Sequence, residues 1–462
     1  MTRTGAQYRF VIGILILILV GCSKPPESET TAATSDTVPT LEHYLAELVK
    51  HDKMMSAVLV TRNGETQFEY YQGLASIEQK VPITADTRFR VGSITKTFTA
   101  VLIMQLVESE QLHLDTTLEK FFPAVPNAER ITIKQLLNHR SGIHSFTDEQ
   151  VYLTYMTTPQ TRAEMLERVQ AYEPVFEPGT EHRYSNSNYV LLGYIIEDLY
   201  QQPYAQVLQD KITQPLGLIS TGFGDAIDIA DNEASSYRFS RAWQPAPETH
   251  MSVPHAAGAV VSTARDINAF LVGLFNGKLV AESSLNRMME LQDGYGLGMF
   301  AMPFYASRLY GHNGSIDGFI ASAAYNPEDG IAMTVLSNAV NMTFNDALIA
   351  VLSAVYGKPI EIPEFSRKPI SLDSDAKEKT LGVYASDNLP MDIELRLEGD
   401  QLMAQATGQS ALPLTPFSAT EFRFEPAGIV MEFDAASIEG ERYTRFTLKQ
   451  SGAQYVFQRK LD

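Results

Sequence analysis

Cysteine is nearly absent from this chain of 462 residues, which contains a single one, Cys22. A lone cysteine excludes disulfide bonds within the chain, because each disulfide needs two thiols. It also excludes zinc sites built from several thiolates, and a cysteine nucleophile in the body of the chain. The chemistry of the protein must therefore rest on other side chains.

Basic residues are also few. The chain has 36 lysines and arginines against 55 aspartates and glutamates, and its formal net charge is -19 at pH 7. Nucleic-acid binding needs a basic surface, so this balance excludes a nucleic-acid partner, and we interpret the acidity as a solubility feature. Hydrophobic residues make up 44% of the chain, which is enough for the core of a globular protein.

Patterns for metal ligation and membrane spanning are missing as well. Two pairs of histidines could suggest a metal site, but neither pair comes with a carboxylate pattern such as H-E-x-x-H. They are His139 with His144 and His250 with His255. Beyond the N-terminus, no hydrophobic stretch is long enough to span a membrane. We expect no metal and no cofactor.

The N-terminus has the features of a signal peptide over residues 1–21. Arg3 and Arg9 precede an apolar run at 10–20, and this run of about 11 residues is too short to span a bilayer. The string LVGC, which ends at Cys22, resembles the lipobox of bacterial lipoproteins. The resemblance implies cleavage before Cys22 and a lipid on its thiol. We therefore expect a cell-envelope protein, lipid-anchored to a membrane and facing the periplasm or exterior. An ordinary secretory signal is the alternative.

Changes in composition predict the domains of the rest of the chain. Residues 22–40 are rich in Ser, Thr, Pro and Glu, which predicts a disordered tether. A large globular domain follows at 41–358, and a proline-punctuated linker at 359–375. Hydrophobic and polar residues then alternate, most clearly at 393–398, which predicts a separate antiparallel β domain at 376–462.

Local patterns predict several elements of the large domain. Asn63-Gly64 lies between two strand-like runs at 57–61 and 66–71, which is typical of a β-hairpin. The segment 318–337 is strand-like and is broken by a turn at 327–330. Further helices are predicted at 133–137, 162–172 and 188–199.

One short motif suggests nucleophilic catalysis. Ser93 and Lys96 precede an apolar run at 98–107 that predicts a buried helix, and residues at i and i+3 share a helix face. A serine hydroxyl needs a base within hydrogen-bond reach, and a lysine can be that base when burial lowers its pKa. The start of a helix also favours developing negative charge at Ser93. The same spacing recurs at Ser374 and Lys377 in a polar segment, and we interpret that copy as chance.

Two further motifs add candidate residues. Tyr184-Ser185-Asn186 could place a phenol and an amide on the same side of a loop, and Gly311 to Ser315 precedes a predicted strand. Each has a structural alternative: Tyr184 could be a buried structural phenol, Asn186 the N-cap of a helix, and His312 an ordinary loop residue.

Together these motifs resemble the superfamily of serine β-lactamases and penicillin-binding proteins. The resemblance is closest to class C β-lactamases and their esterase and peptidase relatives, and it covers roughly residues 41–355. The matching blocks are FRVGSITKTFTA, LLNHRSGI, FEPGTEHRYSNSNYVLLGYIIE, VSTARDINAF and YGHNGSIDGF. The resemblance implies an α+β fold, in which an antiparallel sheet is flanked by helices and the site lies beside a helical subdomain. The string LEGDQLMAQATGQSALPLTP resembles a β domain often appended to these hydrolases.

The resemblance also implies roles for individual residues. Ser93 would attack the substrate carbonyl and become acylated, and Lys96 and Tyr184 would share the proton transfers, with the base left open between them. Asn186 would bind the substrate amide or orient Lys96. The backbone N–H groups of Ser93 and Ser315 would form the oxyanion hole.

His312 and Gly314 stand where many β-lactamases have the Lys and Gly of K-T-G, a motif whose lysine helps to hold the substrate carboxylate. A mostly neutral imidazole supplies less charge, so β-lactam specificity is in doubt, while hydrolysis is not. We expect a serine hydrolase of esters, amides or peptides, including those with D-amino acids. The alternatives are a true class C-like β-lactamase and a catalytically silent binding lipoprotein with the same fold.

Overall fold

The computed structural model describes residues 37–450 and 453–460. The predicted signal peptide, Cys22 and most of the predicted tether lie outside the described residues. The predicted end of the tether at residue 40 is wrong, because helix α1 (Thr37–Lys50) begins before residue 41. Its residues Leu41, Leu45 and Leu48 are buried on one face, so the apolar spacing of this segment specifies a packed helix. None of the helices in the described part of the chain is long and apolar enough to cross a membrane.

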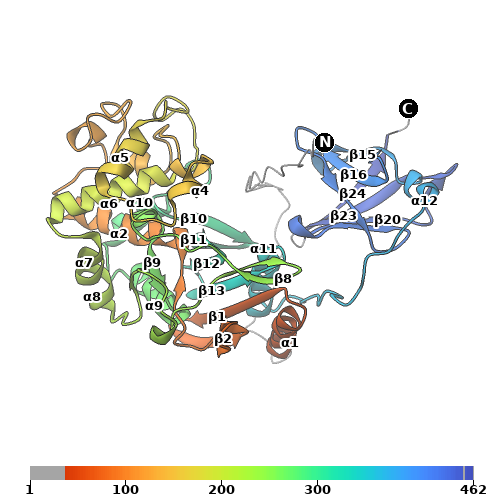
Figure 1. Cartoon of the computed structure of the whole chain (residues 1–462), viewed down its shortest axis with the longest axis horizontal. Helices are drawn as coiled ribbons and strands as arrows, with labels where there is room; N and C mark the ends of the chain where they lie inside the picture. Colours follow the sequence, from red (N-terminus) through yellow and green to blue (C-terminus); the bar gives the residue numbers. More distant parts are fainter. Residues whose placement is uncertain (1–36, 451–452, 461–462) are drawn as a thin grey trace, which may run out of the picture. The chain divides into compact units, whose positions relative to one another are not determined.

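An antiparallel sheet forms the centre of the large domain (Figure 1). Its main strand order is β10-β11-β12-β13-β1-β2, and β7 joins it beside β13 and also pairs with β8. The predicted hairpin is confirmed as β1 and β2, and the predicted broken strand as β12 and β13. The strands are β1 (Met54–Arg62), β2 (Glu65–Gln72), β7 (Tyr237–Ser240), β8 (Ala242–Pro245), β10 (Phe300–Phe304), β11 (Ser307–Ile316), β12 (Phe319–Asn326) and β13 (Ile331–Val340).

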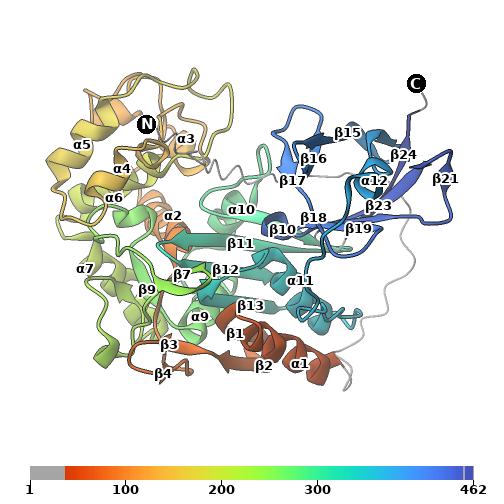
Figure 2. The same cartoon turned by 45° about the vertical axis from the view of Figure 1, so that its right-hand side comes forward.

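Both faces of this sheet are covered. In β1, Ala57 and Leu59 belong to one hydrophobic cluster, and Val58 and Val60 to another, because alternate side chains of a strand point to opposite faces. Helix α9 (Ala264–Phe275) packs on the first face and shares its hydrophobic cluster with the helical subdomain, while α1 and α11 (Phe344–Val355) pack on the second face (Figure 2).

The helical subdomain is built around two apolar helices in contact, α2 (Thr95–Glu108) and α6 (Asn186–Tyr200). The helices predicted at 133–137, 162–172 and 188–199 are present, with bounds that differ by two residues at most. The other helices are α3 (Ile133–Leu137), α4 (Tyr152–Tyr155), α5 (Arg162–Gln170), α7 (Tyr204–Leu208), α8 (Gln214–Leu216) and α10 (Glu282–Met289). Two small sheets pair β3 (Leu74–Ser76) with β4 (Val81–Pro82), and β5 (Phe89–Arg90), β9 (Val260–Ser262) and β6 (Gly222–Phe223).

The C-terminal part is an antiparallel β domain with a hydrophobic core of its own, as the alternating sequence predicts. Nine strands pair in the order β17-β16-β15-β14-β24-β23-β20-β19-β18, and β21 (Ile438–Glu439) pairs with β22 (Arg442–Tyr443). The nine are β14 (Gly382–Ser386), β15 (Leu389–Glu398), β16 (Gln401–Ala406), β17 (Leu412–Pro413), β18 (Thr415–Pro416), β19 (Glu421–Phe424), β20 (Ile429–Phe433), β23 (Arg445–Gln450) and β24 (Ala453–Arg459).

The second Ser-x-x-Lys copy begins this β domain in helix α12 (Ser374–Glu378). The amine of Lys377 binds both the carbonyl and the carboxylate oxygen of Asp400, at 2.7 Å each. These contacts with Asp400 give the second copy a structural role.

Candidate active site

Ser93 lies in the single 3-10 turn η1 (Gly92–Ile94) that joins β5 to α2. Helix α2 begins at Thr95, slightly later than the motif predicts, and the shared face is present as expected. Lys96 Nζ lies 2.9 Å from Ser93 Oγ. The turn requires a glycine, because Gly92 has a φ of +53° and a Cβ there would come within 2.8 Å of the Ser315 backbone nitrogen.

Lys96 is fully buried and has two other contacts at hydrogen-bond distance. Its amine lies 2.8 Å from Asn186 Oδ1 and 2.8 Å from the carbonyl oxygen of Ala257. Burial lowers the pKa of Lys96 well below its ordinary value of 10.5. A neutral amine has two hydrogens and one lone pair, which matches two acceptors and one hydroxyl. The three contacts fit either protonation state, and the lowered pKa favours the neutral lysine, which can accept the proton of Ser93.

Tyr184 lies against this pair, with its ring centroid 4.8 Å from Lys96 Nζ. Burial raises the pKa of Tyr184, and a hydrogen bond with Ser93 offsets part of that increase. The phenol is therefore protonated at neutral pH and can donate a proton.

Asn186 is the first residue of α6, whose N-cap is Ser185, so the N-cap interpretation of Asn186 is wrong. Both ends of its amide are occupied: Oδ1 accepts from Lys96, and Nδ2 donates to Thr147 Oγ1 over 2.9 Å. This network fixes the orientation of the amide, with its oxygen towards Lys96.

The backbone of β11 lies directly against the turn that carries Ser93. A Cβ on Gly314 would come within 1.9 Å of the Val91 carbonyl oxygen and 3.1 Å of the Ser93 nitrogen. Together with the close approach of Gly92 to the Ser315 nitrogen, this contact brings the two expected oxyanion-hole donors into one place.

His312 lies on strand β11, so the interpretation as a loop residue is wrong. Its side chain is only 4% exposed; Nε2 lies 2.8 Å from the Tyr295 hydroxyl, and Nδ1 contacts the Asn313 carbonyl oxygen. A neutral ring with its hydrogen on Nδ1 satisfies both contacts. Burial and the nearby Lys96 lower the pKa of His312 to about 3, so it supplies no positive charge at neutral pH.

Two further residues lie in this place that the sequence did not assign to it: Tyr295, and His139, which was considered only as half of a histidine pair for a metal site. His139 is fully buried, its Nδ1 accepts the backbone N–H of Ser185 over 3.1 Å, and its ring centroid is 4.2 Å from that of Tyr184. The signals were present, because His139 lies in the block LLNHRSGI, and glycines flank Tyr295 on both sides. Within the described residues, no group of three His, Cys, Asp or Glu side chains is arranged to hold a metal ion.

The sequence matches the family described as beta-lactamase over residues 41–356. It is also 23% identical over 408 residues to a penicillin-binding protein of Bacillus subtilis (strain 168), a match that covers 81% of this chain and 89% of that protein.

Two solved structures are similar. The D-amino acid amidase from Ochrobactrum anthropi SV3, complexed with L-phenylalanine amide, is 29% identical with a TM-score of 0.63, covering 70% of this chain and 99% of the amidase. The octameric penicillin-binding protein homologue from Pyrococcus abyssi shares the fold at 24% identity, with a TM-score of 0.65, covering 91% of this chain and 100% of that one. The α+β fold implied by the resemblance is confirmed, and the chain belongs to the β-lactamase family of serine hydrolases.

Proposed function

We propose that the protein hydrolyses amides and esters through an acyl-enzyme formed on Ser93. One observation carries this proposal: a buried amine, Lys96, lies 2.9 Å from Ser93 Oγ while Asn186 and Ala257 accept its own hydrogens. A hydroxyl beside a neutral amine is an activated nucleophile. The same geometry argues against a catalytically silent binding protein.

The proposed reaction begins when the Lys96 amine takes the Ser93 proton as Oγ bonds to the carbonyl carbon. The carbonyl electron pair moves to its oxygen, where the N–H groups of Ser93 and Ser315 stabilise the charge. When the C=O bond reforms, the bond to the leaving group breaks, and that group takes a proton from Lys96 through the hydroxyl of Tyr184. Water then attacks the acyl-enzyme in the same way, and Ser93 regains its proton as the acid is released.

We assign Lys96 as the base of the free enzyme and Tyr184 as the proton carrier to the leaving group. Burial acts in opposite directions on the two, since it lowers the pKa of Lys96 and raises that of Tyr184. At neutral pH the amine can therefore accept a proton and the phenol can donate one.

As substrates we propose amides and esters without a carboxylate near the scissile bond, including amides of D-amino acids. The similarity to a D-amino acid amidase supports this class. The neutral His312 supports it too, because penicillins and D-alanine-terminated peptides carry a carboxylate near the scissile bond, and a neutral imidazole offers it no charge. The similarity to a penicillin-binding protein makes β-lactams the second candidate class.

We also propose that the mature chain is a lipoprotein, anchored through Cys22 to a bacterial membrane and facing the periplasm or exterior. The support is the sequence alone: Arg3 and Arg9, the apolar run and the string LVGC.

A substrate panel tests the proposed function. The full chain is assayed with D- and L-phenylalanine amide, p-nitrophenyl acetate and nitrocefin, with Ser93→Ala as the control. We expect a higher kcat/KM for an amide or ester than for nitrocefin, and no turnover by the control. If nitrocefin is the best substrate, the protein is a β-lactamase; if nothing is turned over and a fluorophosphonate does not label Ser93, the binding-protein alternative is correct.

A further inference from the structure

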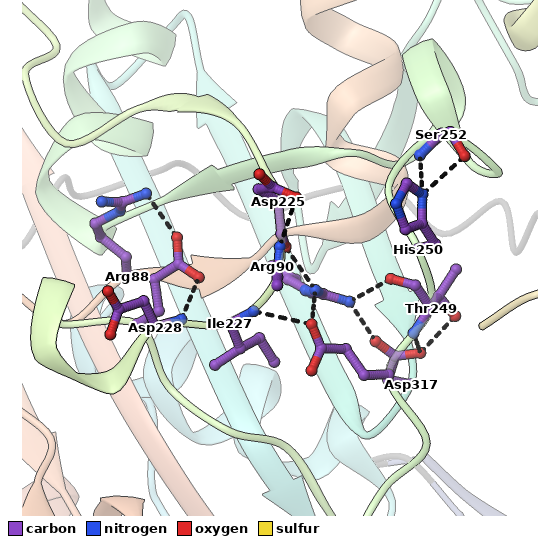
Figure 3. A network of polar contacts seen from close by, with 12 residues as sticks. Arg88, Arg90, Asp225, Ile227, Asp228, Thr249, His250, Ser252 and Asp317 are labelled. Carbon is purple, nitrogen blue, oxygen red and sulfur yellow. Dashed lines mark hydrogen bonds and ion pairs between the residues drawn. The ribbon is translucent and has the colours of Figure 1, made fainter. Parts of the chain in front are cut away.

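A buried ionic network lies beside the turn that carries Ser93, centred on the guanidinium of Arg90 (Figure 3). The Arg90 side chain is 2% exposed. Its Nη1 donates to Asp317 Oδ2 over 2.9 Å and to the Thr249 carbonyl oxygen over 2.7 Å. Its Nη2 donates to the Asp225 carbonyl oxygen over 2.9 Å and to Glu248 Oε1 over 2.8 Å.

The carboxylate of Asp317 is equally enclosed, with a side chain only 1% exposed. While Oδ2 accepts from Arg90, Oδ1 accepts the backbone N–H of Thr249 over 3.0 Å and its hydroxyl over 2.6 Å (Figure 3). Both terminal nitrogens of the guanidinium and both carboxylate oxygens are hydrogen-bonded, while Arg90 Nε has no partner. A buried arginine and carboxylate joined in this way form a rigid connection, because either charge left alone would be costly.

The two members of this ion pair lie close in the chain to the two expected oxyanion-hole donors. Arg90 ends β5, three residues before Ser93, and Asp317 follows β11, two residues after Ser315. Next to this ion pair, the backbone before Ser93 and the backbone of β11 are in contact, because Gly314 leaves no room for a Cβ against Val91. The ion pair therefore joins the segment just before Ser93 to the segment just after Ser315, the two residues whose N–H groups are the expected oxyanion-hole donors.

We propose that Arg90 and Asp317 are positioning residues that set the spacing of the Ser93 and Ser315 N–H groups. This inference rests on the proposed function, in which those groups stabilise the oxyanion. The polar contacts of both side chains go to one another and to the segment 225–249, so they act through the backbone and need not touch the substrate.

The first test is Asp317→Asn, which keeps the shape of the side chain and removes its charge. Loss of one oxyanion-hole donor costs roughly 100- to 1000-fold in kcat, and a displaced donor should cost less. We expect kcat on the best ester or amide of the panel to fall about ten- to hundredfold. KM should change less than about threefold, because the oxyanion forms only in the transition state.

The matched control is Glu233→Gln. The Glu233 side chain is 8% exposed, and its Oε1 accepts from Arg88 Nη2 over 2.7 Å, so it is also a buried carboxylate paired with an arginine of the same region. Apart from their contact with each other, the side chains of Arg88 and Glu233 form hydrogen bonds with Asp231 and Asp228, respectively, and not with β11. We expect kcat of this variant to remain within about twofold of wild type.

A second readout separates positioning from loss of stability. Sulfur is larger than oxygen and accepts hydrogen bonds more weakly, so a well-formed oxyanion hole favours an ester over the matching thionoester. We expect Asp317→Asn to reduce the ester-to-thionoester ratio of kcat/KM at least fivefold, and Glu233→Gln to leave it unchanged. Both substrates are measured on one sample, so the ratio is independent of the folded fraction.

Arg90→Lys serves as the second variant if Asp317→Asn fails to fold. It keeps a positive charge but loses the planar fork that binds Asp317 and Glu248 together, so the ratio should again fall. An unchanged ratio and a kcat within threefold of wild type, in whichever variant folds, would overturn the inference while leaving the proposed function intact. If wild type neither turns over substrate nor is labelled at Ser93, the proposed function itself fails.

Discussion

Lys96 and His312 are both buried beside the catalytic serine, and burial lowers the pKa of each. Burial has the opposite effect on Tyr184, whose pKa is raised. The lowered pKa of Lys96 favours its neutral form, and at neutral pH His312 is a neutral imidazole and Tyr184 a protonated phenol. Such a site can move protons without first removing a stable charge, and it offers no cation to a substrate carboxylate at the position of His312.

Replacing the base should remove most of the activity. We expect Lys96→Ala to lower kcat about 100- to 10,000-fold, the range of general acid–base assistance, with a much smaller change in KM. Lys96→Arg should be equally impaired, because a guanidinium does not give up its proton. Steady-state kinetics check both variants. Lys377→Ala, at the second copy of the motif, is the control, and a similar loss of kcat there would contradict our reading of the two copies.

The buried His312 should make the protein less stable in acid. Its pKa is about 3 when folded and 6.5 ordinarily, so below pH 6.5 the unfolded chain takes up a proton that the folded chain does not. The free energy of unfolding therefore falls as the pH drops from 6.5 towards 3, by at most about 1.4 kcal/mol per pH unit for this group.

His312→Gln should remove this part of the pH dependence. Urea unfolding at pH 7 and pH 5 measures the loss of stability in each protein, and the loss should be smaller in the variant. An equal loss of stability in the two proteins would show that His312 is already protonated in the folded state at pH 5, which would contradict its lowered pKa.

At this scale the sequence predicted the pairing of Ser93 with Lys96, because the spacing i, i+3 within one helical turn brings the two together. It did not predict His139 or Tyr295. His139 contacts Ser185, and Tyr295 contacts His312. The two residues of each pair are well separated in the chain, and local periodicity carries no information about such contacts.

At the scale of elements, the contact between the 3-10 turn η1 and strand β11 holds the site together. A Cβ on Gly314 would lie 1.9 Å from the Val91 carbonyl oxygen, so the turn and the strand would have to separate. Overpacking of this kind costs roughly 1–3 kcal/mol of stability. Its effect on the oxyanion donors should be greater than its effect on the fold.

We expect Gly314→Ala to fold with reduced stability and to lose about a hundredfold or more in kcat, because a small displacement of the donors has a large effect on the transition state. Gly222→Ala is the matched control, since a Cβ there meets nothing within 4 Å. Melting temperatures and kcat of both variants test this. A Gly314→Ala enzyme with normal kcat would place the oxyanion hole elsewhere.

The ends of elements were predicted less well than their middles. Helix α6 begins at Asn186, two residues before the predicted start, without a local side-chain cap. Its first N–H groups are satisfied from afar, since Asn186 N donates to Ser145 Oγ and Ser185 N to His139 Nδ1. A helix start of this kind cannot be read from the neighbouring residues, because the capping groups come from another segment.

At the scale of the whole molecule, hydrophobic alternation predicted an antiparallel β domain at the C-terminal end, and the structure shows such a domain with a core of its own. The central pairing of the large domain is different, because β1 and β13 are neighbours although their registered residues Val58 and Val335 are far apart in the chain. Alternation identifies both strands but not their pairing. That part of the fold was available only through the resemblance to a known family.

The proposed function requires Ser93 to be the single acylated residue, and covalent labelling measures this directly. The full chain is treated with a fluorophosphonate, its intact mass is determined, and the adduct is assigned to a peptide. We predict one adduct on Ser93 in wild type and in Ser374→Ala, and none on Ser93→Ala. Of the two Ser-x-x-Lys copies, the one at Ser93 has a buried amine beside the hydroxyl, whereas Lys377 is bound to the carboxylate of Asp400. An adduct of the same mass on folded Ser93→Ala would contradict the account.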